Sequence, residues 1–332
     1  MKRILLIISV SILIVSLIGC QRNDFEDYIQ SIKKTREIEK GQQSMDMKMN
    51  MDFDTEGLSS EEIKDINYFK SFESQLNLIY DNEADKTIAR NYYNFGGIGF
   101  DTTFYDDGEK RFIRMPIIGK YLVLSEEFTD NYSKDVDGKN EYISKKTIED
   151  IRNKWLTTIK SDDVFVSKDS FMTTPNGEVK VRKYTVNLTG EQFKNLLSES
   201  TDILLKDELL KETIEEYINK GRKKHKISDV SKLLNDFKEG LKKSKIDNLS
   251  YVAYIDIDGY IVKEEIKFDL KFIGSDFYNI NGFKYGLEIN RWDIESEQKF
   301  EFPEFTKENT LDPEEIEQGI PFMFENIFDK NE

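Results

Sequence analysis

Apolar and polar residues alternate strictly in the stretch SMDMKMNMDFD, residues 44–54, and this pattern predicts a half-buried β-strand. Residues two apart on a strand share a face, so four methionines and Phe53 lie together, opposite the polar residues. Just before this stretch, apolar residues recur at helical spacing, which predicts a helix over 24–40 that Gly41 ends. The N-terminal part of the fold is therefore expected to be a helix followed by a one-faced strand.

Many short strand-like segments follow, and turn residues separate them. The predicted strands cover residues 75–81, 87–94, 99–105, 110–115, 121–125, 164–171, 179–188, 283–290 and 296–302, and 249–273 is predicted to be a hairpin. The turn sequences Asp106-Asp107-Gly108, Asn176-Gly177 and Asp258-Gly259 are typical of hairpin connections. Residues 55–67 are expected to be a loop or a helical turn.

Two further helical stretches interrupt the strands. Apolar spacing predicts one helix over 147–160. The other covers about 190–245 and follows Thr189 and Gln192, whose spacing is that of a capping box. Because strands come in consecutive runs, they indicate an antiparallel sheet rather than alternating β-α units, and an α+β fold is expected.

The N-terminus has the pattern of a secretory signal. A positively charged start precedes an apolar run that is too short to span a bilayer and fits a signal-peptide core. The run ends in Leu17, Ile18, Gly19 and Cys20, which resembles the lipobox of bacterial lipoproteins. The resemblance implies that residues 1–19 are removed and that Cys20 carries a diacylglyceryl anchor. The protein is then expected on the extracytoplasmic face of the cell membrane.

Composition limits the function classes. The chain has 332 residues, a formal net charge of −16 and 12% aromatic residues, so it is acidic and rich enough in aromatics to form a core. An acidic surface is unsuited to nucleic acid, which requires contacts from positive side chains. One cysteine excludes an intrachain disulfide. Residues 306–332 form an acidic C-terminal tail, and residues 20–40 comprise the anchor, a tether and the first helix.

Element order and two segments resemble a known family. After the first helix and the alternating strand come KYTVNLTGEQFKNLL, a strand that leads into a capped helix, and YIDIDGYIVKEEIKFDL, an Asp-Gly hairpin. The pattern resembles Gram-positive lipoproteins related to the lipoprotein-carrier (LolA-like) fold. The resemblance implies a strongly curved antiparallel sheet over 41–305, a half-open barrel, with helices packed on its concave face and a helical insertion at about 190–245. Members of that family carry acyl chains or glycolipids between sheet and helices.

The alternating stretch contains four of the chain's eight methionines, Met45, Met47, Met49 and Met51. Thioethers are soft ligands that suit Cu(I), which is one interpretation. However, Phe53 continues the same face, and methionine also fills irregular apolar surfaces. The stretch is therefore interpreted as an apolar face, either packed in the core or facing a bound lipid.

A basic segment stands out in this acidic chain, with Arg222, Lys223, Lys224 and Lys226 at its centre. Such a run is usually a solvated helix face. Each positive charge near an anionic membrane surface contributes about 1 kcal/mol, so contact with lipid headgroups is the alternative.

No catalytic motif is recognisable. The chain has one histidine and lacks the G-x-S-x-G, H-E-x-x-H and P-loop signatures. Asp-Val-Asp-Gly at 135–138 and Asp-Ile-Asp-Gly at 256–259 lack the further ligands of a calcium loop. The sequence therefore predicts a non-enzymatic lipoprotein without a cofactor or metal. It binds either a hydrophobic ligand or, with a solid core, another envelope protein.

Overall fold

The computed structural model describes residues 24–115, 119–124, 143–212, 230–274 and 279–311. The lipobox with Cys20 lies outside the described residues, and so do Arg222, Lys223, Lys224 and Lys226. The lipid anchor and the headgroup-contact segment therefore stay predictions.

Three of the described helices begin at a capping side chain, Ser59, Ser144 or Thr189. The described helices are α2 (Asp24–Arg36), α3 (Ser60–Phe69), α5 (Lys145–Thr158), α6 (Gly190–Leu204) and α8 (Val230–Lys242), with a short 3-10 turn at Ser161–Asp163. Thr189 and Gln192 form the predicted capping box of α6, which satisfies backbone N–H groups at the helix start. Within the described part of the chain, no helix combines the length and apolarity needed to cross a bilayer.

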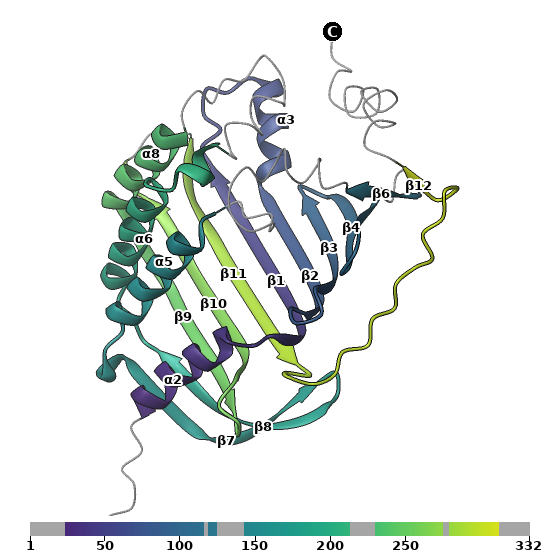
Figure 1. The fold of residues 1–332 in the computed structure, drawn as a ribbon. Helices are drawn as coiled ribbons and strands as arrows, with labels where there is room; N and C mark the ends of the chain where they lie inside the picture. The colour runs from purple at the N-terminus through teal and green to yellow at the C-terminus, as the bar shows by residue number, and fades with distance from the viewer. Residues whose placement is uncertain (1–23, 116–118, 125–142, 213–229, 275–278, 312–332) are drawn as a thin grey trace, which may run out of the picture.

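Within the described residues, twelve strands form one sheet. They are β1 (Lys40–Phe53), β2 (Ser71–Asp81), β3 (Lys86–Phe95), β4 (Ile98–Asp107), β5 (Arg111–Met115), β6 (Lys120–Leu124), β7 (Val164–Thr174), β8 (Gly177–Val186), β9 (Ser244–Asp256), β10 (Ile261–Phe272), β11 (Ile280–Trp292) and β12 (Thr310–Leu311). Their spatial order is β12-β6-β5-β4-β3-β2-β1-β11-β10-β9-β8-β7, so β12 and β7 are the two edges and the sheet is not closed. All pairs are antiparallel except β12 with β6 (Figure 1).

The predicted sheet with helices is confirmed, and so is the long strand at the methionines. The three predicted hairpin turns are present, with Gly108, Gly177 and Gly259 at positive φ, where glycine avoids a Cβ clash. The predicted strand at 296–302 is wrong, because this segment has no strand pairing. It crosses instead towards β12, as Figure 1 shows.

The register assigns side chains to the two faces of the sheet. Directly paired residues share a face, so Met45 lies on the same side as Ile289 of β11. Ile289 pairs with Glu264 of β10, Glu264 with Ala253 of β9, and Ala253 with Tyr184 of β8, so all of these side chains lie on that side. We call this side the helix face, because Tyr184 and Ala253 pack there against Tyr28 of α2.

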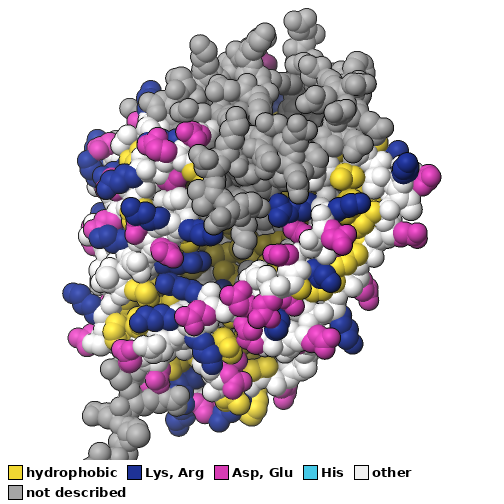
Figure 2. Space-filling model, in the orientation of Figure 1, with side chains coloured by type: hydrophobic (Ala, Val, Ile, Leu, Met, Phe, Trp, Pro, Cys, Tyr) yellow, Lys and Arg dark blue, Asp and Glu magenta, His cyan; other side chains and the backbone are white. Residues whose placement is uncertain are grey.

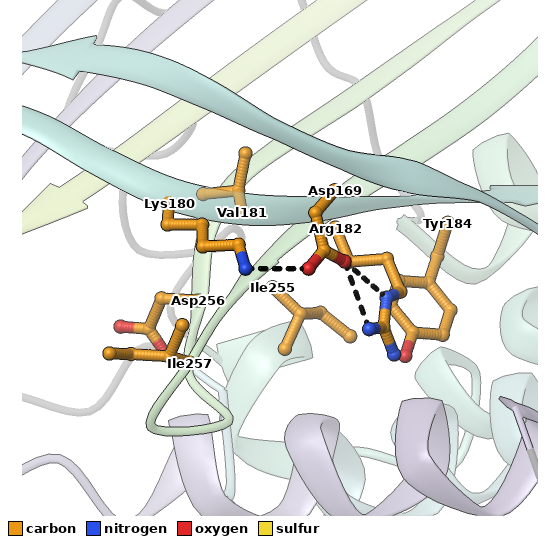
Figure 3. Close-up of a pocket in the computed structure, with 8 residues that line it drawn as sticks. All are labelled: Asp169, Lys180, Val181, Arg182, Tyr184, Ile255, Asp256 and Ile257. Atoms are coloured by element: carbon orange, nitrogen blue, oxygen red, sulfur yellow. Dashed lines mark hydrogen bonds and ion pairs between the residues drawn. The ribbon is translucent and has the colours of Figure 1, made fainter. Parts of the chain in front are cut away.

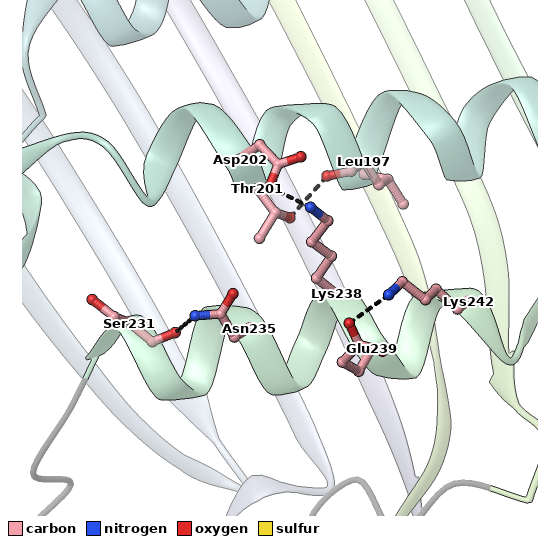
Figure 4. A network of polar contacts seen from close by, with 8 residues as sticks. All are labelled: Leu197, Thr201, Asp202, Ser231, Asn235, Lys238, Glu239 and Lys242. Atoms are coloured by element: carbon pink, nitrogen blue, oxygen red, sulfur yellow. Dashed lines mark hydrogen bonds and ion pairs between the residues drawn. The ribbon is translucent and has the colours of Figure 1, made fainter.

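Two apolar clusters fill the space between the helices and strands β8 to β11. One centres on Tyr28, Tyr184 and Tyr251, and α5 adds Trp155 to it. The other joins Phe193 of α6 to Phe268 of β10, with other buried residues from α6, α8 and β10. Helices α6 and α8 are also linked by an ion pair between Asp202 and Lys238 (Figure 4). This part of the helix face has a filled core.

The opposite face of the sheet is covered differently. The irregular segment after β11 places Phe300, Phe302 and Phe305 against Ile88 and Phe112. The rings of Phe305 and Phe112 stack with centroids 3.5 Å apart. This packing explains why the alternating aromatics at 300–302 resemble a strand: they cover an apolar surface without pairing to a neighbour.

Candidate functional site

The methionine face lies near the middle of the sheet, on its helix face. Met45, Met47, Met49, Met51 and Phe53 are all partly buried. Their partners on β11 are Ile289, Leu287, Tyr285, Phe283 and Ile280, and their partners on β2 include Leu76, Ser74 and Phe72. We call the five β1 residues together with these apolar partners the methionine wall. It continues the apolar surface beyond the helix-covered core.

The same face is apolar on β3 and β4 near the turn that joins them. The register places Phe95, Ile98 and Phe100 there, and these side chains are 39%, 46% and 40% exposed. Figure 2 looks onto the helix face, where hydrophobic side chains gather in a hollow near the middle. An exposed apolar surface of this kind is typical of a binding site rather than of an inert surface.

Gly96 lies in the β3–β4 turn, at one end of this apolar surface, where the chain packs closely against α3. Its φ is +56°, and a Cβ built there lies 2.7 Å from the Asn67 carbonyl oxygen, so any side chain would collide with backbone. The end of α3 is therefore held against the β3–β4 turn. Tyr68 and Phe69, at this end of α3, are 40% and 58% exposed.

A cavity of about 430 Å³ lies at the other end of the methionine wall. It is lined by Ile32, Thr35, Arg36, Ile38, Gln43, Tyr80, Ile151, Arg152, Trp155, Tyr251, Ile261, Glu264 and Arg291. We call it the arginine cavity. Its lining does not include the methionines, but Gln43 directly precedes Met45 on the same face of β1, about 6.6 Å away along the strand.

A chain of polar contacts forms the inner side of this cavity. Arg291 pairs with Glu264 at 2.7 Å, and the Tyr251 hydroxyl donates to the other Glu264 oxygen at 2.8 Å. Tyr28 is hydrogen-bonded to Tyr251 and accepts from the Trp155 indole N–H at 3.3 Å. Because Tyr251 gives its one proton to Glu264, Tyr28 donates to Tyr251. The chain thus connects α5 and α2 to three strands.

Burial changes the titration of these hydroxyls. It raises the pKa of Tyr251 well above the usual tyrosine value, and the nearby Glu264 charge adds to the effect. Burial likewise raises the pKa of Tyr28. Both hydroxyls therefore stay protonated across the physiological range and act as hydrogen-bond donors.

Arg36 and Arg152 line the outer side of the cavity and are exposed. Partial burial lowers the pKa of Arg36, the neighbouring Arg152 charge lowers it further, and Glu149 acts in the opposite sense. Among the described residues, neither guanidinium has an ion pair or a side-chain hydrogen bond. With Arg291 and Glu264 they give the lining three positive charges and one negative charge.

A second cavity, of about 280 Å³, lies between the β7–β8 hairpin and the tip of β9. Asp169 bonds there to Lys180 at 2.8 Å and to Arg182 at 2.9 and 3.0 Å (Figure 3). These hydrogen bonds lower the pKa of Asp169. The charges of Asp169, Lys180 and Arg182 are thus paired with one another, and Asp169 lies at the irregularity in the β7–β8 register. We interpret this group as structural.

The sequence predicted the methionine face but not the arginine cavity. Arg36, Arg152, Glu264 and Arg291 come from four distant parts of the chain, and no local spacing connects them. Among the described residues, no group of three or more His, Cys, Asp or Glu side chains is placed to hold a metal ion.

No protein-family model matches the chain, and no curated protein matches it. Among solved structures, the chain is similar to a DUF1329 family protein from Desulfovibrio piger, with 6% sequence identity and a TM-score of 0.20. That match covers 84% of this chain and 93% of the other.

Proposed function

We propose that this protein is a membrane-anchored extracytoplasmic lipoprotein that binds or carries a hydrophobic ligand, a lipid or an acyl chain. In this proposal the sheet is a half-open barrel, and the ligand lies along the methionine wall between sheet and helices. The observation that carries it is the contrast along one face. The face is filled beneath the helices over β8 to β11, whereas at β1 to β4 it is mainly apolar but partly exposed.

The dimensions of the wall suit an acyl chain. Met45 to Phe53 span eight residue steps, about 26 Å at 3.3 Å per residue. The hydrocarbon layer of one leaflet is about 15 Å deep, which is half of the bilayer's hydrocarbon core. The wall is longer than that, so it can hold a lipid chain. Burial contributes about 0.8 kcal/mol per methylene. Flexible methionine side chains adapt to chains of different shape.

Native mass spectrometry of the gently purified protein tests the proposal. We expect a population heavier than the polypeptide by the mass of a lipid, and uptake of added fatty acid. The Met47→Leu/Met49→Leu variant serves as a control, because leucine keeps the wall apolar but cannot supply thioether ligands. It should retain uptake. A single apo mass with no uptake would rule the proposal out, and a Cu(I) affinity lost in the leucine variant would favour the metal interpretation.

The anchor is tested separately. Metabolic labelling with an alkyne fatty acid should modify the wild-type protein and should fail for Cys20→Ser. Labelling that survives this substitution would contradict the lipobox prediction.

The filled core beneath the helices supports a second candidate, a non-catalytic interaction or structural lipoprotein with an envelope protein partner. Tyr28 and Ala253 are fully buried there, and such packing leaves no room for a ligand. Affinity capture from detergent-solubilised membranes separates the two candidates. Retention of one stoichiometric protein without co-purifying lipid would favour the second.

A further inference from the structure

We propose that the arginine cavity binds the anionic headgroup, carboxylate or phosphate, of a lipid whose chain lies on the methionine wall. This inference rests on the proposed function and specifies its ligand class. It commits to an amphipathic anion, with Arg36 and Arg152 as the contacting cations and Arg291 as the inner charge.

The charge of the cavity is the first argument. The protein as a whole is strongly acidic, with a formal net charge of −16, yet the lining of this cavity has three arginines against Glu264. Glu264 is already engaged by Arg291 and by the Tyr251 hydroxyl. Both outer guanidiniums line this one cavity, and the Arg152 charge lies close enough to lower the pKa of Arg36. An anion between them would relieve that repulsion.

The chemistry of the donors is the second argument. Guanidinium is planar and presents paired N–H donors that match both oxygens of a carboxylate or phosphate. Gln43 and Thr35, which also line the cavity, add uncharged polar groups. The polar chain through Tyr251 holds Arg291 in place, so the inner charge is preorganised before a ligand arrives.

The position of the cavity is the third argument. On the helix face, Gln43 precedes Met45 on β1, Tyr80 follows Leu78 on β2, and Arg291 follows Ile289 on β11. Strands β1 and β11 thus change from polar to apolar at the same level, because Gln43 pairs with Arg291 and Met45 with Ile289. On β2 the change lies one step further out, since Leu78 pairs with Gln43 and Tyr80 with Gly41. A headgroup in the cavity would direct its chain along the wall. This arrangement distinguishes an amphipathic ligand from a neutral one.

Photolabelling of the full chain in amphipol tests the proposal. The probes share one diazirine-bearing sixteen-carbon chain and carry a carboxylate, a phosphate or an alcohol at the end. Crosslinks to β1 are quantified by peptide mass spectrometry. We expect the two anionic probes to reach half-saturation at least about tenfold below the alcohol, because charged hydrogen bonds contribute that much. Arg36→Gln/Arg152→Gln should remove this preference, so that the half-saturation of the anionic probes rises to that of the alcohol.

The matched control is Lys33→Gln/Lys146→Gln, which removes two exposed charges from the same helices outside the cavity lining. It should keep the preference, and both double variants should keep the wild-type unfolding midpoint. An Arg36→Gln/Arg152→Gln protein that still prefers the anionic probes would overturn the inference.

The remaining outcomes separate the two proposals. If the alcohol labels β1 as well as the anions do, the acyl-binding proposal stands and the headgroup site falls. If no probe labels β1, the acyl-binding proposal itself fails. Competition by inorganic phosphate or acetate identifies the source of the anion. If these ions displace the label as effectively as the chain-bearing probes do, the cavity is a free-anion site. That result would overturn the lipid assignment.

Discussion

Replacing Arg291 and Glu264 with methionine, singly and together, tests whether the polar chain in the arginine cavity holds the fold around it. The two side chains pair at 2.7 Å and are only 15% and 23% exposed. Arg291 also donates to the Ile261 carbonyl at 3.1 Å, and Glu264 accepts from Tyr251. Each single variant leaves one of these charges partly buried without its partner.

The geometry of the pair sets how much unfolding free energy each variant should lose. Unit charges about 4 Å apart attract by about 4 kcal/mol at an effective dielectric constant of 20, and desolvation opposes part of that. Breaking a fully buried pair costs about 3–5 kcal/mol, and the residual exposure of both groups reduces this figure. We therefore expect each single variant to lose about 2–3 kcal/mol of unfolding free energy. Because the double variant leaves no orphan charge, it should lose clearly less than the sum.

Urea unfolding followed by tryptophan fluorescence measures this cycle. Trp155 is one of the two tryptophans and belongs to the same polar chain, so its emission reports the site directly. Lys48 and Glu73 form a control pair at 3.5 Å that is 61% and 44% exposed, and its coupling should be below about 0.5 kcal/mol. Additive effects at Arg291 and Glu264, to within about 0.5 kcal/mol, would refute the reasoning.

Three further variants test other parts of the account. Burial would raise the pKa of Asp207, but hydrogen bonds to α5 and its cap lower it, so Asp207→Asn should cost about 1–2 kcal/mol at neutral pH. A folded-state pKa below the unfolded value means that the wild-type advantage disappears as the pH falls below about 4, and a gap that persists at lower pH would contradict this. Gly282→Ala should prevent folding or disrupt the sheet, because its Cβ would lie 2.2 Å from a carbonyl oxygen of β10, and an unchanged circular dichroism melt would be inconsistent with that register. Phe305→Ala should lower the unfolding free energy by about 1–3 kcal/mol by uncovering Phe112, whereas no loss in urea unfolding would place the C-terminal segment elsewhere.

The strands could be predicted because their signals are local. Period-two alternation identified β1, and turn glycines such as Gly177 and Gly259 marked the hairpins. The same rule was wrong at 296–302, where alternating aromatics pack on an existing sheet surface. Alternation reports that one side of a segment is buried, but it does not report whether a strand lies beside it. Only the register of the sheet supplies that information.

The binding surface could be predicted only in part for the same reason. The methionines share one strand, so their common face follows from the sequence. The extension of that face to Tyr285 and Phe72 depends on how β11 and β2 pair with β1. The arginine cavity depends on contacts between residues as far apart as Arg36 and Arg291. Long-range pairing is set by the fold as a whole, and one sequence contains no short pattern for it.

The central claim is that the methionine wall contacts an alkyl ligand, and two adjacent positions on β1 test it most directly. Met49 lies on the wall, whereas Asn50, the next residue, lies on the opposite face. With Cys20 replaced by serine, a single cysteine at position 49 or 50 is labelled with a polarity-sensitive fluorophore and titrated with a long-chain fatty acid. The account predicts a saturable blue shift for the label at 49 and none at 50. No shift at 49, or equal shifts at both positions, would contradict it.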